Sequence, residues 1–190
     1  MANHRLLPAL RCLQAGGVIA YPTEAVYGLG CDPLDPDAVA RLLAIKGRKA
    51  AKGLILISHD RESLAHWLEP VDAELDAQLH ATWPGPVTWV LPARRWVPRW
   101  LTGGRDTLAV RVTAHPGAAA LCRAFGGPLV STSANRSGHP PARSALEARC
   151  RLGPAIDGVV PGPTGGRRQP SEIRDGRSGR ILRPGSGADA

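Results

Sequence analysis

Four cations lie close together in the segment from Ile45 to Leu56, which reads IKGRKAAKGLIL. They are Lys46, Arg48, Lys49 and Lys52. Arginine offers a flat fork of donors and lysine a point charge, so a fixed array of both suits phosphate or carboxylate groups. Many charged runs are only solvated surface, so the cluster by itself leaves an anion site and an exposed basic loop both open.

A second group of polar side chains lies where the segment 129–132 opens into the sequence STSANRSG. The side chains of Ser131, Ser133 and Asn135 can hydrogen-bond to phosphate oxygens, to a ribose or to a base edge. The same residue types are common in turns. This segment therefore predicts either a nucleotide-binding loop or an ordinary turn.

A single arginine, Arg111, interrupts the apolar sequence LAVRV. In a strand, its neighbours Val110 and Val112 point to the opposite face. Burying an unpaired charge is costly, so Arg111 needs a counter-ion. An acidic side chain of the protein or a carboxylate of a substrate would serve.

Several familiar site motifs are absent from the chain. It has no GxxxxGK[ST], no GxGxxG after a strand, no GxSxG and no HExxH. This argues against P-loop proteins, Rossmann dehydrogenases, serine hydrolases and zinc enzymes. The four cysteines form no CxxC pair, which favours a reducing, cytoplasmic setting over a disulfide framework.

The bulk composition is that of a basic globular protein. With 190 residues and 43% hydrophobic content, we expect one domain over residues 1–190, with a core from about 6 to 185 and a loose tail at 186–190. The net charge of +8 favours polyanionic partners. No apolar segment has the length of a membrane span or a signal peptide, so we expect no membrane association.

The elements that position these side chains follow from hydrophobic periodicity and turn residues. Helices are predicted at 6–13, 37–45, 61–67, 71–82, 116–125 and 144–152. Strands are predicted at 18–21, 54–58, 87–91, 107–112, 129–132, 156–160, 172–174 and 180–182. Segments 22–30 and 92–105 are predicted to lack regular structure. The alternation indicates an α/β fold with a mixed sheet, in which the loops 22–30, 46–53 and 131–138 meet at strand ends.

Seven segments, taken together, resemble one known family. They are YPTEAVYGLGCDP, KGR…KGLILI, WPGPVTWVLPA, LAVRVTAHP, PLVSTSANRSG, PSEIRD and ILRPG, in that order between Leu6 and Gly185. Their order and register resemble the YrdC/TsaC family of threonylcarbamoyl-AMP synthases, in its short bacterial form. The resemblance implies a twisted, open, mixed α/β sheet with flanking helices and an electropositive concave face.

The resemblance also implies an activity. ATP, L-threonine and bicarbonate become threonylcarbamoyl-adenylate, pyrophosphate and water. ATP would enter with Mg²⁺ as a substrate complex, and no tightly bound cofactor is implied. The product would pass to a tRNA-threonylcarbamoyl transferase complex, which builds threonylcarbamoyladenosine beside the anticodon.

The family's motifs imply roles for eleven residues. The bicarbonate-derived and phosphate groups would be contacted by Lys46, Arg48 and Lys52. The nucleotide would be contacted by Ser131, Ser133, Asn135, Ser171 and Arg183. Threonine would be contacted by Thr23, Tyr27 and Arg111. No metal ligand from the protein is implied, since ATP would carry the Mg²⁺.

Two positions depart from the family pattern. Lys49 stands where many members have proline, which adds a cation and frees the local backbone. Glu172 follows Ser171 where many members have threonine, so a neighbouring hydroxyl is missing.

Two alternative functions stay open. The first is a non-catalytic protein that binds double-stranded RNA or tRNA, or assists ribosome assembly. Arginines at 94, 95, 99 and 105 favour it, and Trp96 and Trp100 among them would either stack on bases or pack under a loop. The second alternative is an acyl- or carbamoyltransferase that uses a different amino acid.

Overall fold

A computed structural model describes residues 6–185 of the chain. Its centre is a sheet of nine strands. These are β1 (Ile19–Pro22), β2 (Tyr27–Gly30), β3 (Ile55–Ser58), β4 (Val87–Pro92), β5 (Thr107–Val112), β6 (Leu129–Ser133), β7 (Gly158–Val159), β8 (Glu172–Asp175) and β9 (Ile181–Arg183).

The strands run in the order β7-β1-β2-β6-β3-β5-β4-β8-β9. The pairs β1–β7, β3–β5 and β4–β8 are parallel, whereas the other neighbours are antiparallel. Strands β7 and β9 form the two edges, so within residues 6–185 the sheet is open and does not close into a barrel. The predicted α/β fold with an open mixed sheet is confirmed.

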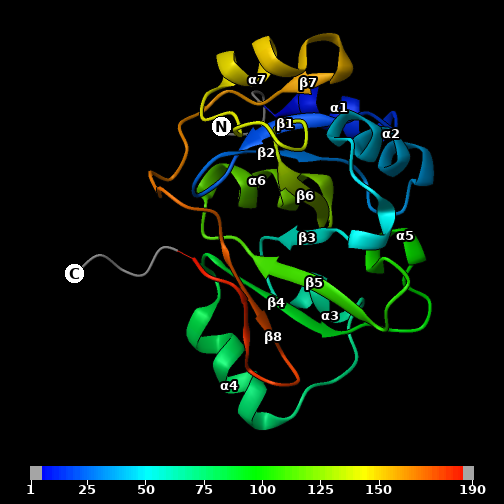
Figure 1. Ribbon diagram of the computed structural model, residues 1–190, viewed down its shortest axis with the longest axis vertical. Helices are drawn as coiled ribbons and strands as arrows, with labels where there is room; N and C mark the ends of the chain where they lie inside the picture. The colour runs from blue at the N-terminus through cyan, green and yellow to red at the C-terminus, as the bar shows by residue number, and fades with distance from the viewer. Residues whose placement is uncertain (1–5, 186–190) are drawn as a thin grey trace.

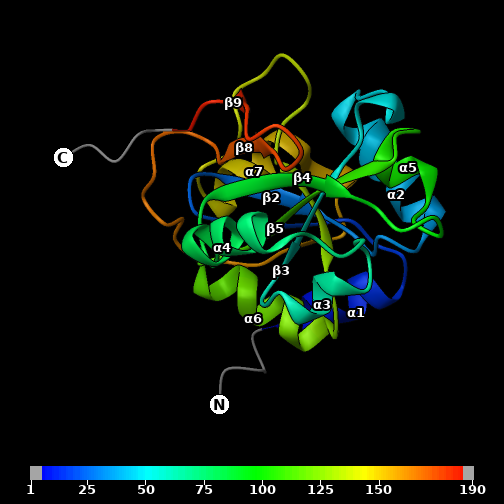
Figure 2. The same ribbon diagram turned by 90° about the horizontal axis from the view of Figure 1, so that it is seen from below.

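Seven α-helices and two short 3-10 turns are described over residues 6–185, and the helices pack around the sheet (Figure 1). They are α1 (Leu7–Gln14), α2 (Pro36–Lys46), η1 (Ala50–Lys52), α3 (Glu62–Ala65), α4 (Ala73–Thr82), α5 (Arg99–Thr102), α6 (Pro116–Phe125), α7 (Ala145–Leu152) and η2 (Gly153–Ala155). In Figure 2, α1 and α6 lie on the side of the sheet away from α7.

The apolar side chains divide between the two faces of the sheet. Ile19 and Tyr21 of β1 pack with α1 and α6, while Ala20 between them packs with α2 and α7 on the other face. This division follows from the alternation of side chains along a strand. Both faces are therefore covered where β1 crosses the molecule.

Helix α2 illustrates how local sequence sets the ends of an element. Asp35 caps its N-terminus by accepting hydrogen bonds from the amides of Asp37 and Ala38, and Pro36 occupies the first turn. Gly47 ends the helix in the left-handed region with φ of 58°. The helix therefore stops at Lys46 and leaves that side chain at the mouth of a loop.

Two predictions for the backbone are wrong. Segment 22–30 contains strand β2, which the two glycines of YGLG concealed. A Cβ at Gly30 would lie 2.6 Å from the carbonyl oxygen of Val130, so this strand needs glycine for close approach. Segment 92–105 contains α5, which begins after Pro98 and ends at Gly103.

The other predicted elements are present with small shifts of their ends. The predicted tail 186–190 lies outside the described residues, and the single domain over 1–190 stays a prediction. None of the helices described over residues 6–185 is long and apolar enough to cross a membrane.

Candidate active site

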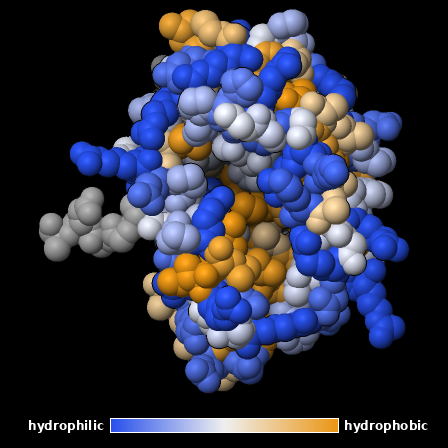
Figure 3. Space-filling view, in the orientation of Figure 1, coloured by the Kyte–Doolittle hydropathy of each residue, from blue (hydrophilic) through white to orange (hydrophobic). Residues whose placement is uncertain are grey.

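One large pocket opens in the middle of the molecule, with a volume of about 870 Å³. Figure 3 shows it as a hollow with an apolar floor and hydrophilic residues around it. Ten of the eleven residues that the family motifs imply line this pocket. They are Thr23, Lys46, Arg48, Lys52, Arg111, Ser131, Ser133, Asn135, Ser171 and Arg183.

Lys46 is buried, and all its donor capacity is used inside the protein. Its Nζ donates to the carbonyl oxygen of Ser133 at 2.6 Å, to Ser133 Oγ at 3.1 Å and to Asn135 Oδ1 at 2.8 Å. Burial, with a smaller contribution from Arg48, lowers the pKa of Lys46 to about 8. Lys46 thus ties the end of α2 to the loop that follows β6.

Ser133 and Asn135 belong to the same closed network. Ser133 Oγ donates to Asn135 Oδ1 at 2.6 Å. The side-chain Nδ2 of Asn135 donates to the carbonyl oxygens of Arg136 at 2.9 Å and His139 at 2.6 Å. Every donor of the Asn135 side chain is therefore used by the loop itself, so this residue shapes the pocket wall.

Arg48 and Lys52 form a cationic side of the pocket, with Arg105 as a neighbour that the motifs did not mark. None of these three forms an ion pair with a carboxylate within residues 6–185. Arg48 Nη2 donates only to the carbonyl oxygens of Gly53 and Lys52. Burial and the nearby Arg105 lower the pKa of Arg48. Cations gathered without carboxylates favour an anionic ligand.

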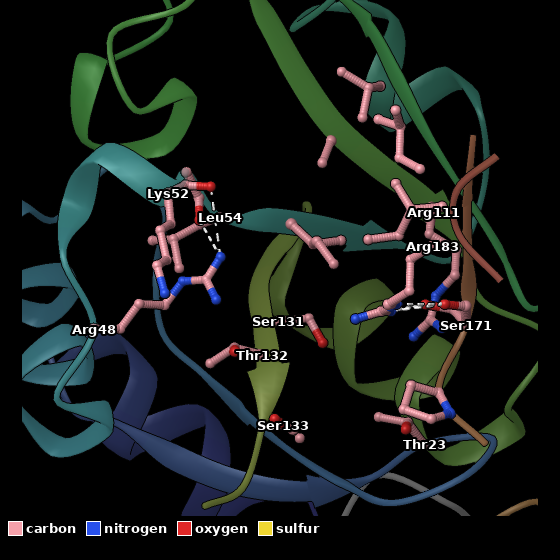
Figure 4. A pocket seen from close by; sticks show the side chains of 18 of the residues that line it. Thr23, Arg48, Lys52, Leu54, Arg111, Ser131, Thr132, Ser133, Ser171 and Arg183 are labelled. Carbon is pink, nitrogen blue, oxygen red and sulfur yellow. Dashed lines mark hydrogen bonds between the residues drawn. The ribbon is translucent and has the colours of Figure 1, made fainter. Parts of the chain in front are cut away.

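Strand β6 lies between this cationic side and the rest of the pocket (Figure 4). It places Ser131 in the pocket wall beside Gly28 of β2. A Cβ at Gly28 would lie 3.3 Å from the Thr23 methyl group and 3.5 Å from Ser131 Oγ. Glycine at this position keeps the wall between the two hydroxyl residues clear.

Ser171 and Arg183 meet on the opposite side of the pocket (Figure 4). Arg183 donates to the carbonyl oxygen of Ser171 at 2.7 Å and to its Oγ at 3.2 Å. Ser171 Oγ also lies 3.1 Å from Thr88 Oγ1, on the neighbouring strand β4. Thr88 is fully buried and does not line the pocket, so it supports the Ser171 side chain from behind.

Arg111 has its counter-ion within the protein, a residue that our sequence analysis missed. Arg111 Nη2 lies 3.3 Å from Glu24 Oε2, and both side chains are buried. Burial alone would raise the pKa of Glu24, but Arg111 and hydrogen bonds from Thr113 and Ala114 lower it. The sequence signal for this pair was an acidic residue, Glu24, in segment 22–30, together with a single cation, Arg111, in the apolar strand 107–112.

Thr23 and Tyr27 flank Glu24 but take different positions. Thr23 lines the pocket, and its hydroxyl donates to the carbonyl oxygen of Val26 at 2.7 Å. Tyr27 is fully buried, is not among the pocket-lining residues, and donates its hydroxyl to the carbonyl oxygen of Gly162 at 2.6 Å. The structure therefore places Tyr27 behind the wall, where it anchors the segment leading to β8.

Comparison with known proteins gives a family for this arrangement. The model of the Sua5/YciO/YrdC family, described as "Telomere recombination", matches residues 11–185. A threonylcarbamoyl-AMP synthase of Halorhodospira halophila is 63% identical over 171 residues, which are 90% of each chain. One from Nitrosococcus oceani is 57% identical over 181 residues, covering 95% of this chain and 98% of the relative.

Solved structures agree with the sequence relatives. P. abyssi Sua5 complexed with L-threonine superposes with a TM-score of 0.88 at 36% identity, over 95% of this chain and 53% of that one. This chain thus spans about half the length of the P. abyssi protein. E. coli YciO superposes with a TM-score of 0.84 at 30% identity, over 97% of this chain and 91% of that one. The chain belongs to the Sua5/YciO/YrdC family.

Proposed function

We propose that this protein is a threonylcarbamoyl-AMP synthase, an adenylate-forming nucleotidyltransferase. The relatives that share 63% and 57% of their residues with it over most of both chains carry that name. The observation that carries the proposal is a single pocket that joins unpaired cations, hydroxyl groups and a buried arginine–carboxylate pair. Such a pocket suits a polyanion beside an amino acid.

The proposed reaction joins three substrates. The amine of L-threonine attacks carbon dioxide derived from bicarbonate and forms a carbamate. A carbamate oxygen then attacks the α-phosphorus of ATP, and the bond to the pyrophosphate leaving group breaks. Threonine, bicarbonate and ATP thus become threonylcarbamoyl-adenylate, pyrophosphate and water.

The protein's share of this chemistry is to position the reactants and to balance negative charge. In our proposal Arg48, Lys52 and Arg183 hold phosphate oxygens, and Ser131 and Ser171 add hydroxyl donors. None of these steps needs a nucleophile from the protein. This fits a pocket in which the lining residues that the structure describes include neither a cysteine nor a histidine.

The threonine site is proposed on the Arg111 side of the pocket. Arg111 would bind the carboxylate of threonine, and Thr23 lies beside it in the pocket lining. Lys46, Ser133 and Asn135 would hold the wall between this site and the phosphates through their mutual hydrogen bonds.

We also propose that Mg²⁺ arrives with ATP, bound by phosphate oxygens, as this ion usually is. Two further carboxylates line the pocket, but each is engaged within the protein. Asp106 pairs with Arg177, and Asp175 accepts hydrogen bonds from the Arg177 amide and the Ser178 hydroxyl. The product would pass to a tRNA-threonylcarbamoyl transferase complex in the cytoplasm.

A variant of the cationic segment tests the proposal. Arg48→Ala should abolish the release of pyrophosphate from ATP that depends on both threonine and bicarbonate, because the triphosphate loses a charged donor. Lys49→Ala is the matched control, since Lys49 belongs to the same segment but does not line the pocket. Normal turnover by a folded Arg48→Ala protein would refute the assignment.

RNA binding is a second function that one observation favours. Trp96 is 51% exposed and packs against Trp67 in a tilted arrangement with ring centroids 4.9 Å apart, and Arg94 and Arg95, which precede it in the chain, are exposed. Trp100 instead packs under the loop and donates to the carbonyl oxygen of Pro33 at 3.2 Å. Binding of tRNA or double-stranded RNA on this basic face should weaken steeply with salt, whereas threonine binding should not.

The alternative of a different amino acid substrate has a direct test. Pyrophosphate release should require threonine and should not proceed when serine, valine or alanine replaces it at equal concentration. Equal rates with another amino acid would favour the alternative.

A further inference from the structure

Glu24 is a buried carboxylate in the pocket wall to which the proposed function gives no role. It lies between β1 and β2 and is 8% exposed. Its Oε1 accepts hydrogen bonds from Thr113 Oγ1 at 2.7 Å and from the Ala114 amide at 3.1 Å. Its Oε2 accepts no hydrogen bond from any residue that the structure describes.

Arg111, the ion-pair partner of Glu24, also has a buried polar atom that the described residues leave without a hydrogen bond. Arg111 is 6% exposed, and its Nε has no hydrogen-bond partner within residues 6–185. Its Nη2 faces Glu24 Oε2 across 3.3 Å in an ion pair, which leaves Glu24 Oε2 and Arg111 Nε without a hydrogen bond in the described part of the chain. Buried polar groups are normally hydrogen-bonded, so this pair is poised for a ligand that supplies both a donor and an acceptor.

The charge of this pair distinguishes it from the cationic side of the pocket. Arg48 and Lys52 have no carboxylate partner in the described part of the chain, and Figure 4 shows them across the pocket from Arg111. A triphosphate suits the unpaired cations, and Glu24 would repel it. An arginine–carboxylate pair instead matches a molecule with one positive and one negative group.

We propose that Glu24 determines specificity for an amino acid by binding the α-ammonium group while Arg111 binds the α-carboxylate. This rests on the proposed function, which places threonine at Arg111. Two donors hold Oε1 in place, so Arg111 is the member of the pair that shifts when the ligand enters. One internal ion pair is then exchanged for two ion pairs with the substrate.

The test compares threonine with its 2-hydroxy analogue, 2,3-dihydroxybutanoate, which keeps the carboxylate and the side chain but lacks the amino group. The wild-type protein should bind threonine at least about tenfold more tightly than the analogue in calorimetry. Glu24→Gln should weaken threonine by a similar factor and leave the analogue unchanged or tighter. The preference should therefore disappear in this variant.

Glu147→Gln is the matched control, because Glu147 forms an exposed ion pair with Arg151 on α7 and does not line the pocket. It should preserve the preference for threonine. Unchanged ATP affinity in Glu24→Gln shows that the variant is folded. If that variant does not fold, the wild-type comparison decides the matter, since equal affinity for the two ligands overturns the proposal.

An equal loss of both ligands in a folded Glu24→Gln protein would also overturn the proposal and leave Glu24 as a support for Arg111. The proposed function fails on a different result. If the wild-type protein forms the adenylate from threonine but shows no preference over the analogue, only the role of Glu24 is lost. If threonine does not bind at all, the proposed function itself is lost.

Discussion

Lys46 shows how one buried cation can shape a site by holding a loop. Its three hydrogen bonds to Ser133 and Asn135 fix the wall between the two sides of the pocket. The motif resemblance gave this lysine a direct contact with phosphate or carbonate. The structure shows it positioning other groups, and any contact with the substrate requires it to give up one of those bonds.

The lowered pKa of Lys46 predicts proton uptake on ATP binding. At pH 8 about half of the Lys46 side chains are neutral, because burial lowers their pKa to about 8. The negative charge of ATP favours the ammonium form and raises this pKa. Binding should therefore take up about half a proton at pH 8 and close to none at about pH 7. Calorimetry in buffers of different ionisation enthalpy measures this uptake.

Lys46→Arg provides the control for that measurement, because arginine stays protonated at either pH. The variant should bind ATP without proton uptake. Equal uptake in the wild type and in Lys46→Arg would assign the proton to another group.

Arg111 should contribute to stability as well as to binding. Arg111→Ala leaves Glu24 buried without its cation, which should lower the free energy of unfolding by about 3–5 kcal/mol at neutral pH. The double variant Glu24→Gln/Arg111→Ala should lose less than the sum of the losses in Glu24→Gln and Arg111→Ala. Urea denaturation measures the free energy of unfolding of all three variants.

Arg41→Ala is the control, because it removes an exposed ion pair with Asp157. It should lower the free energy of unfolding by only about 1 kcal/mol or less.

At single positions, the sequence indicated which residues belong near the pocket better than it indicated where their side chains point. The family motif implied that both Thr23 and Tyr27 contact the substrate threonine. Strand β2 instead turns Gly28 toward the pocket and Tyr27 and Leu29 toward the core. A strand with period two allows only one of two adjacent residues to face the pocket. The sequence predicts no strand within 22–30, so it gives no such alternation for β2.

At the scale of elements, the segment 161–171 is tied to the rest of the pocket by backbone contacts. Gly162 accepts from the Tyr27 hydroxyl, and Pro163 O lies 3.1 Å from His115 Nε2. The amides of Gly165 and Arg167 donate to the carbonyl oxygens of Thr23 and Glu24. This segment leads to Ser171, so its anchoring sets one side of the site.

Tyr27→Phe removes the first of these anchors. We expect a loss of about 1 kcal/mol in the free energy of unfolding, because the hydroxyl of Tyr27 donates to a backbone carbonyl. Amide hydrogen exchange in 162–170 should become faster, while exchange in α6 stays the same. Unchanged exchange in 162–170 would show that this hydrogen bond does not hold the segment.

Strand β2 should be intolerant of a side chain at Gly30. A Cβ there would lie 2.6 Å from Val130 O and 2.7 Å from Tyr21 Cε1, both in the packed core. Gly30→Ala should therefore destabilise the protein by about 1–3 kcal/mol in thermal or urea unfolding. Gly127→Ala is the control, since nothing lies within 4 Å of a Cβ at that position. Equal stability of the two variants would contradict the close packing described here.

Most elements could be predicted from periodicity, because their apolar residues recur with the spacing of a helix or strand. Strand β5 and helix α6 were predicted at their observed ends, and Pro116 and Gly126 mark the two ends of α6 clearly. Strand β2 was missed because close approach to β6 demands glycine. Helix α5 was missed because a single turn between Pro98 and Gly103 carries no periodic pattern.

At the scale of the whole molecule, the order of the strands makes the site. Strand β6 lies between β2 and β3, so the loops 22–30, 46–53 and 131–138 reach one pocket although they are distant in the chain. Strands β8 and β9 at the far edge bring Ser171 and Arg183 to the opposite side. The sequence predicted that these loops would meet, but only the structure shows that Glu24, within segment 22–30, pairs with Arg111.

The central claim is that this pocket joins bicarbonate, threonine and ATP into one product. The most direct measurement is mass spectrometry of a reaction with ATP, Mg²⁺, L-threonine and ¹³C-labelled bicarbonate. We predict threonylcarbamoyl-adenylate carrying one ¹³C atom, present with the wild type and with Lys49→Ala and absent with Arg48→Ala. Pyrophosphate released without a labelled adenylate, or an adenylate formed equally by Arg48→Ala, would contradict the claim.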